Sequence, residues 1–226
     1  MNEDRSVPEY DVIRVDQTPP LNKAAVDSFW RTIPKLALVE TITGSAAPCS
    51  TDVRVCWTSE ALHLLFHCVD TEVFNEFRQR DDPIYGQEVV EMFIAEGEEN
   101  PTAYREFELS PFNVQWDGDI SNICDSGEQM TADVSWDAAS FRSFVDIIPA
   151  KTRTLPFCTC WNARISIDFQ DLAQDGKPPL PGDIWRANFY RIEHKPQECY
   201  LAWSPTLCSP ACYHVPSRFG RLRFQG

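Results

Sequence analysis

Apolar and polar residues alternate with a period of two along much of the chain from residue 51 onward. In the segment 52–57, Val53, Val55 and Trp57 fall on one face. A short polar turn separates this segment from a second alternating run over residues 61–70. Such alternation is typical of strands with one buried face, and two runs this close together predict a hairpin.

Similar runs continue to the C-terminus, and turn residues recur at roughly the spacing of an all-β domain. Residues 71–87 predict a long polar loop, and residues 168–175 predict one helical turn. The pattern favours an antiparallel β-sandwich, of jelly-roll or immunoglobulin-like shape, with few short helices. We expect a single domain in which residues 1–50 form an N-terminal arm packed on a sandwich of residues 51–226. The further predicted strands cover residues 88–95, 104–109, 112–116, 141–148, 159–169, 184–193, 199–204 and 219–224.

One carboxylate stands out in the predicted strand 88–95. Val90, Met92 and Ile94 form an apolar face, so Glu91 points to the opposite side between apolar neighbours. A shielded carboxylate needs a partner, and Arg105 on the following strand is the candidate. Such a pair can be structural as readily as functional.

Two other strands carry polar residues opposite a core stripe. Planar amides, a guanidinium and a carboxylate supply the paired donors and acceptors that a polyhydroxylated ring needs. The alternative is the solvated outer face of an antiparallel sheet, and periodicity does not choose between the two. If these strands neighbour the Glu91 strand, one sheet face would carry Glu91, Arg105, Asn162, Arg164, Asn188 and Tyr190.

Composition narrows the class of partner. There are 20 basic and 34 acidic residues, giving a net charge of −14, which argues against binding to nucleic acid or to an anionic membrane surface. The acidic first residues do not resemble a signal peptide, so we expect a cytoplasmic protein, or a secreted one if a leader has been trimmed. The nine cysteines include no CxxC pair, so we expect mostly reduced thiols and no zinc site.

Metal binding has little support in the sequence. The triplet Asp117-Gly118-Asp119 could serve calcium, but Asp-Gly is first a turn signal. His63 and His67 are too far apart on a strand to chelate one ion easily. We expect no cofactor and no metal, with calcium as a minor alternative.

Several segments resemble family 9 carbohydrate-binding modules and the related DOMON-type domains. The first is DPIYGQEVVEMFI over residues 82–94, and the second is YREFELSP over residues 104–111. The third lies at 185–193, and the C-terminal ones are AWSP and YHVPSRFG at 202–205 and 213–220. They occur in the family's order and cover most of residues 51–224.

The resemblance implies a β-sandwich in which two aromatic rings enclose a sugar. One ring is Tyr85, six residues before Glu91, and the other is Tyr213 or His214 just before the P-x-x-F-G segment. Glu91 and Arg105 would bind hydroxyl groups.

Two functions follow as hypotheses. The first is a binding module that holds a small-molecule or saccharide ligand with a polar ring in an aromatic cleft. The second is a cofactor-independent isomerase or cyclase of small-molecule (secondary) metabolism that uses the same pocket for proton transfer. The catalytic candidates would be Glu91, Arg105, Tyr190 and His214.

Overall fold

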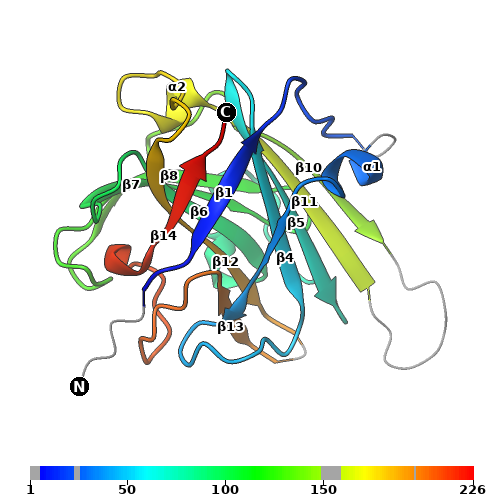
Figure 1. The fold of residues 1–226 in the computed structure, drawn as a ribbon. Helices are drawn as coiled ribbons and strands as arrows, with labels where there is room; N and C mark the ends of the chain where they lie inside the picture. The colour runs from blue at the N-terminus through cyan, green and yellow to red at the C-terminus, as the bar shows by residue number, and fades with distance from the viewer. Residues whose placement is uncertain (1–5, 23–25, 149–158, 196) are drawn as a thin grey trace.

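The protein is a β-sandwich of two packed sheets in a computed structural model that describes residues 6–22, 26–148, 159–195 and 197–226 (Figure 1). The first sheet runs β14-β12-β6-β7-β8-β9, and β13 and β3 extend it from β12. Its strands are β3 (Val39–Glu40), β6 (Val89–Ala95), β7 (Ala103–Leu109), β8 (Gln115–Ser121), β9 (Thr131–Asp133), β12 (Ile184–Glu193), β13 (Cys199–Ala202) and β14 (Gly220–Phe224).

The second sheet runs β10-β11-β5-β4, with β2 paired to the edge of β4. All of these pairings are antiparallel. Its strands are β2 (Lys35–Ala37), β4 (Thr51–Trp57), β5 (Ala61–Asp70), β10 (Arg142–Ile148) and β11 (Thr159–Asp168). The antiparallel sandwich with few short helices is therefore confirmed.

Strand β1 (Glu9–Arg14) joins the two sheets along one side of the sandwich. Its first residues pair in parallel with β14, and its last two pair in parallel with β4. Figure 1 shows it in blue between these two strands. The polar pattern of residues 1–20 predicts no strand there, because only Tyr10 and Val12 of β1 point inward. The segment 1–50, expected as an arm, thus contributes β1, β2 and β3 to the sheets.

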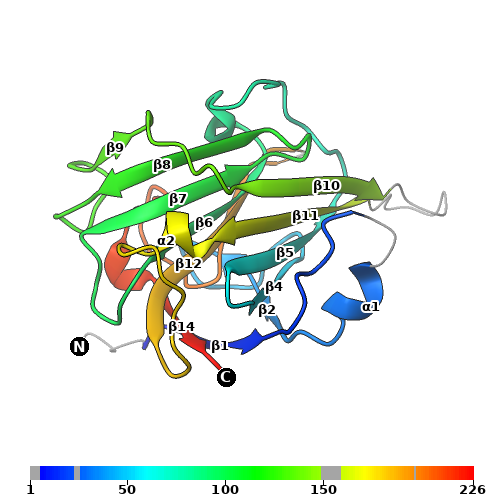
Figure 2. The same ribbon diagram turned by 90° about the horizontal axis from the view of Figure 1, so that it is seen from above.

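The helical elements are short. Helix α1 (Val26–Trp30) lies against the outer side of the second sheet, where Trp30 packs with Cys56 and Leu65 (Figure 2). Helix α2 (Phe169–Leu172) confirms the expected helical turn after β11. Two 3-10 turns, η2 (Ile84–Gly86) and η3 (Pro216–Arg218), lie in the loops around the first sheet. No helix in the described ranges is long and apolar enough to span a membrane.

The inward-facing stripes of both sheets form the main core. Val90, Met92 and Ile94 of β6 belong to the same core cluster as the inward-facing residues of β12 in the same sheet and of β11 in the other sheet, as the alternation predicts. Burial of these side chains is the main stabilising contribution to such a sandwich, at about 25 cal/mol per Å² of apolar surface. Because side chains alternate along a strand, the β6 residues between Val90, Met92 and Ile94 point to the outer face of the first sheet.

The predicted strand over residues 112–116 is wrong. The Ser110 hydroxyl accepts hydrogen bonds from the backbone N–H groups of Phe112 and Val114, and Asn113 has a φ of 62°. These contacts make a turn, and β8 begins only at Gln115. The expected Asp-Gly turn at Asp117 lies instead inside β8.

Eight of the nine cysteines lie in the described ranges, and seven of these, Cys49, Cys56, Cys68, Cys124, Cys199, Cys208 and Cys212, are free thiols there. Cys158 lies outside the described residues. The thiols of Cys49 and Cys199 hydrogen-bond to each other, which lowers the pKa of Cys49 to about 6.

Candidate functional site

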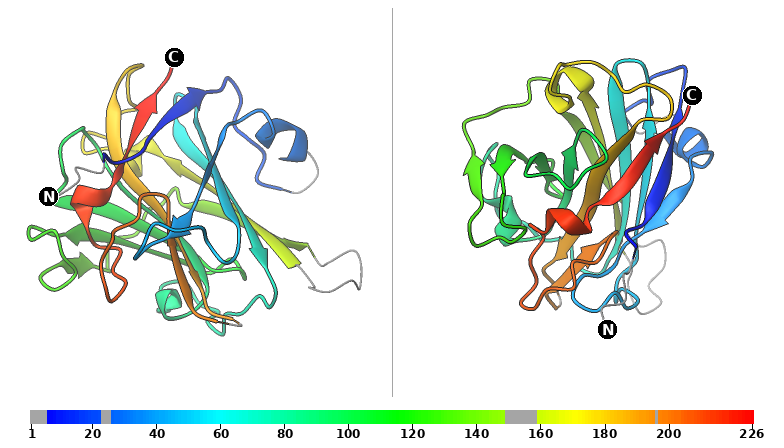
Figure 3. Two further views of the ribbon diagram at one scale, coloured as in Figure 1. Left: turned by 60° about the horizontal axis from the view of Figure 1, so that its bottom comes forward. Right: turned by 60° about the vertical axis from the view of Figure 1, so that its left-hand side comes forward.

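A cavity of about 780 Å³ lies on the outer face of the first sheet. Strands β6, β7 and β8 form its floor, and η2 borders it on one side. The loop 122–130 and the segment before η3 form the other side, and both lie at the same side of the molecule in the left panel of Figure 3. These two segments contact each other, because Asn122 Nδ2 donates to the His214 carbonyl at 3.1 Å. The covered outer face therefore favours a binding site over a simple solvated surface.

Tyr85 forms one wall of this cleft from the 3-10 turn η2. Its ring is 51% exposed and meets the Trp116 indole edge-on, with centroids 6.0 Å apart. A Cβ on Gly118 would lie 2.9 Å from the Trp116 ring, so this glycine lets the indole lie along β8. The wall thus consists of two aromatic rings, of which Tyr85 remains open to a ligand.

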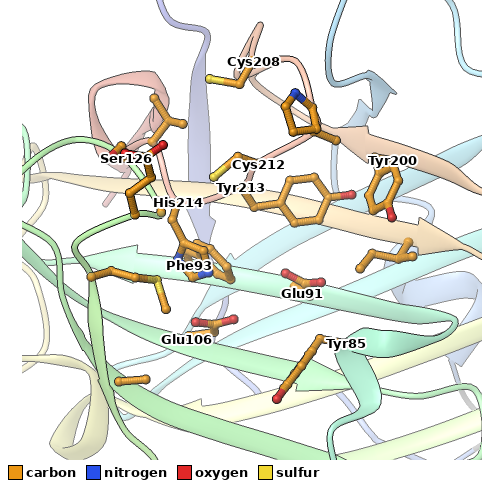
Figure 4. A pocket seen from close by; sticks show the side chains of 18 of the residues that line it. Tyr85, Glu91, Phe93, Glu106, Ser126, Tyr200, Cys208, Cys212, Tyr213 and His214 are labelled. Atoms are coloured by element: carbon orange, nitrogen blue, oxygen red, sulfur yellow. The ribbon is translucent and has the colours of Figure 1, made fainter.

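Tyr213 forms the opposite wall. Figure 4 shows Tyr85 and Tyr213 on opposite sides of the Glu91 carboxylate. Tyr213 stacks on Tyr190 at 4.1 Å between centroids, and its hydroxyl donates to the Arg191 carbonyl at 2.8 Å. The two aromatic positions named by the family resemblance therefore face one cavity.

Tyr190 and Asn188 lie beneath this wall, not in the cavity. The Tyr190 hydroxyl donates to the Tyr213 carbonyl at 2.9 Å. Asn188 Nδ2 donates to that hydroxyl and to the Ser204 carbonyl, and Asn188 Oδ1 accepts from the Ser204 N–H. Both side chains are fully buried, so they hold the C-terminal segment in place.

His214 lines the cavity beside Tyr213. Its ring stacks on Phe93 with centroids 5.0 Å apart, and its Nδ1 shares a hydrogen bond with the Tyr104 hydroxyl at 2.7 Å. Burial lowers the pKa of His214 to about 4, because desolvation disfavours the charged imidazolium. The ring is therefore neutral at physiological pH.

The floor of the cavity is acidic. Glu91 of β6 pairs in register with Glu108 of β7, and Glu106 is opposite Phe93. Carboxylate oxygens of Glu91, Glu106 and Glu108 lie within 4.8 Å of one another, and all three residues are buried. Burial raises the pKa of Glu106 to about 8 and the pKa of Glu91 and Glu108 well above the usual value of 4.5, with mutual repulsion adding to the shift for Glu91 and Glu108.

Arg105 does not reach this floor, which corrects the expected Glu91–Arg105 pair. Arg105 is in register with Ile94, and Glu91 is in register with Glu108, so the two side chains lie on opposite faces of the sheet. Arg105 instead forms an ion pair with Asp119 at 2.5 Å and lies over the Trp136 ring. Its place on the cavity side is taken by Glu106.

Asn162 and Arg164 are also absent from the cavity, because β11 belongs to the other sheet. Arg164 forms a buried ion pair with Asp146, and Asn162 bonds to His67 at 2.8 Å. The expected single face of six polar residues is therefore split between two sheets. The four catalytic candidates do not converge either, since Arg105 faces away and Tyr190 is covered by Tyr213.

The structure does not favour calcium binding at Asp117 and Asp119, because both carboxylates are paired with arginines. Asp117 is paired with Arg80 and accepts from the Ala138 N–H at 2.6 Å, and Asp119 is paired with Arg105.

The sequence reasoning missed Trp116, Glu106 and Glu108. The signal for the two glutamates was present in the alternation of β7, because Tyr104, Glu106 and Glu108 share a face. Trp116 was hidden by the misplaced strand over residues 112–116.

The raised pKa of Glu106 leads to a testable stability effect. Between pH 4.5 and about 8 the folded protein keeps a proton on Glu106 that the unfolded chain loses, so stability falls as pH rises through this window. The Glu106→Gln variant carries no such proton. We expect the variant to gain stability relative to the wild type as pH rises through this range in ligand-free protein, measured by urea unfolding.

Other ionisable groups lie near Glu106, and the difference between the two curves reports Glu106 together with the fall in the pKa of Glu91 and Glu108 that its removal causes. These groups are Glu91 from β6, Tyr104 and Glu108 from β7, and His214 from the C-terminal segment. A difference that stays constant with pH would show that Glu106 ionises normally.

Comparison with known proteins places this chain in one family. The family model for carbohydrate-binding family 9 matches residues 35–224. The chain belongs to this family, and it is a carbohydrate-binding module of the family 9 type.

Three relatives illustrate the similarity. An "Extracellular protein" of Arthroderma benhamiae is 29% identical over 181 residues, which is 77% of this chain and 78% of the relative. The solved structure of a Bacteroides uniformis protein proposed to bind carbohydrate has a TM-score of 0.73 at 18% identity, covering 97% of this chain and 100% of that one. A family 9 module of Caldicellulosiruptor kristjanssonii, solved with cellotriose, has a TM-score of 0.63 at 17% identity and covers 96% of this chain and 94% of that one. A family 9 module of Caldicellulosiruptor kristjanssonii solved with glucose also has a TM-score of 0.63 at 17% identity, and 96% of each chain is covered.

Proposed function

We propose that this protein binds a saccharide unit in the cleft between Tyr85 and Tyr213, without a cofactor. The observation that carries the proposal is the placement of these two rings on opposite sides of the buried Glu91 carboxylate. The apolar C–H face of a sugar ring packs well on aromatic rings, and a carboxyl group can bond its hydroxyls. Modules of the same fold have been solved with cellotriose and with glucose.

The cavity has the size and composition of a small-ligand site. Its volume of about 780 Å³ lies within the range of roughly 300–1,000 Å³ for such pockets. Phe93, Trp116 and Ile192 provide apolar surface in addition to the two tyrosine walls. Glu91 and Glu106 at the floor, with Asp125, Ser126 and Glu128 of the loop 122–130, supply the polar groups that orient a ligand.

The test is a calorimetric titration of the full chain with a panel of β-1,4-linked trisaccharides, including cellotriose. We expect saturable binding of one saccharide per chain, with a change in tryptophan fluorescence because Trp116 lines the cleft. Folded protein that gives neither heat nor a fluorescence change with any saccharide of the panel would overturn the proposal.

A further inference from the structure

The described residues contain three clusters of acidic groups, and two of them surround an arginine. Arg80 lies among Asp81, Asp117 and Asp137, with ion pairs to all three. Arg191 lies among Asp70, Glu88 and Glu193 in the same way. Each arginine offsets the repulsion between its carboxylates. These two clusters are therefore complete within the protein itself.

The third cluster, Glu91, Glu106 and Glu108, contains no cation from the described chain. None of the three glutamates forms an ion pair with a described lysine, arginine or histidine. Glu108 is 1% exposed, and neither of its carboxylate oxygens accepts a hydrogen bond from an N–H group or a hydroxyl group of the described residues. The one hydrogen bond open to it is a proton shared with Glu106.

Glu91 and Glu106 line the cleft directly, as Figure 4 shows, so a positive group that enters the cleft would meet the cluster. An unpaired buried carboxylate is costly, and the two arginine-containing clusters show how this chain usually compensates that cost. The acidic cluster therefore favours a ligand that carries a positive charge.

We propose that the cleft takes an amino sugar, a saccharide whose protonated primary amine binds between Glu91 and Glu106. This inference rests on the proposed function and names its ligand class. An ammonium group has three N–H donors, and two acceptors that it bonds at about 2.8 Å stand roughly 4.6 Å apart. The carboxylate oxygens lie within 4.8 Å of one another, which accommodates this geometry.

The rest of the lining favours an organic cation over a metal ion. Calcium takes about six to eight oxygen ligands. Asp125, Ser126 and Glu128 add oxygen atoms from the loop 122–130, but the lining beside Glu91 and Glu106 is mainly carbon, from Phe93, Trp116 and Tyr213. Aromatic faces attract an ammonium group within about 6 Å and pack against a sugar ring, but they do not ligate calcium.

Binding must also move protons. Since Glu106 holds a proton in the empty cleft below about pH 8, an incoming ammonium replaces that proton, which passes to the buffer. His214 is neutral and contributes no charge. Amine binding is therefore expected to release protons, and neutral-sugar binding is not.

The experiment compares three β-1,4-linked trimers that differ at carbon 2: the glucosamine trimer, its N-acetylated form, and cellotriose. Calorimetry at neutral pH is run in two buffers of different ionisation enthalpy. We expect the amine trimer to bind at least tenfold more tightly than cellotriose, about 1.4 kcal/mol, and to release protons. The Glu106→Gln variant should lose this preference for the amine trimer over cellotriose. The Glu99→Gln variant makes the same substitution on the exposed turn after β6 and should behave as wild type.

Each other outcome has a defined meaning. If cellotriose binds and the amine trimer binds equally or more weakly, the amino-sugar inference is overturned and the proposed function stands. If no trimer binds to folded protein, both fail. If calcium alone binds one per chain and Glu106→Gln abolishes it, the cluster is a metal site and the inference is overturned. Glu108→Gln repeats the test should Glu106→Gln fail to fold.

Discussion

The Arg191→Met variant is expected to lose about 3–5 kcal/mol of unfolding free energy, because it leaves buried carboxylates without their cation. The Arg191 side chain is fully buried and reaches Asp70 at 3.3 Å and Glu88 at 3.1 Å. It also donates to the Val69 carbonyl at 2.9 Å. These contacts connect β12 of one sheet to β5 of the other, so the residue holds the sandwich together at this end.

Urea unfolding of the variant and of a matched control measures this effect. Arg223→Met removes an arginine of comparable length whose pair with Glu9 is half-exposed, and it should cost less than about 1 kcal/mol. The Arg191 penalty should grow as pH rises above about 8, because burial raises the pKa of Glu88 to about 9 and of Glu193 to about 8, so both acids ionise and need the cation only there. Equal costs for the two variants would contradict the bridging role of Arg191.

The Tyr85→Ala variant is expected to weaken saccharide binding by roughly thirtyfold, about 2 kcal/mol. Without Tyr85 a bound sugar ring loses one of its two aromatic walls. The side chain is 51% exposed, so its removal should change the unfolding free energy by less than about 0.5 kcal/mol.

The Phe112→Ala variant is the control for this binding effect. Phe112 is a similarly exposed aromatic residue at 41%, and it packs on Arg78 away from the cleft. Its loss should leave saccharide affinity unchanged. Equal affinities for the wild type and Tyr85→Ala would exclude Tyr85 as a binding wall.

Long strands could be predicted from the sequence, because alternation of apolar and polar residues over many positions fixes both the presence of a strand and its ends. The ten-residue strands β5 and β12 have the predicted boundaries, since each carries a long inward stripe. Strand β1 could not be found in this way, because it has only two inward residues and is held by partners from both sheets. At residues 112–116 a serine hydroxyl and a positive φ override the apolar pattern.

The candidate site was predictable in part. The alternation shows that Glu91 faces away from the core, and the family resemblance points to Tyr85 and Tyr213. The alternation of β7 already puts Arg105 on the face of Phe107 and Leu109, so Glu106 replaces it on the face of Glu91. That Glu108 lies directly opposite Glu91 was not predictable without the register of β6 on β7. The replacement of Arg105 by Glu106 changes the floor of the cleft from an ion pair to an acidic cluster.

The most direct test of the saccharide site is a crystal structure of the protein with a trisaccharide that binds in calorimetry. We expect one sugar ring between Tyr85 and Tyr213, with a polar group of the sugar within hydrogen-bond distance of Glu91 or Glu106. A saccharide bound on another surface, with the cleft between the two tyrosines empty, would contradict the proposed site.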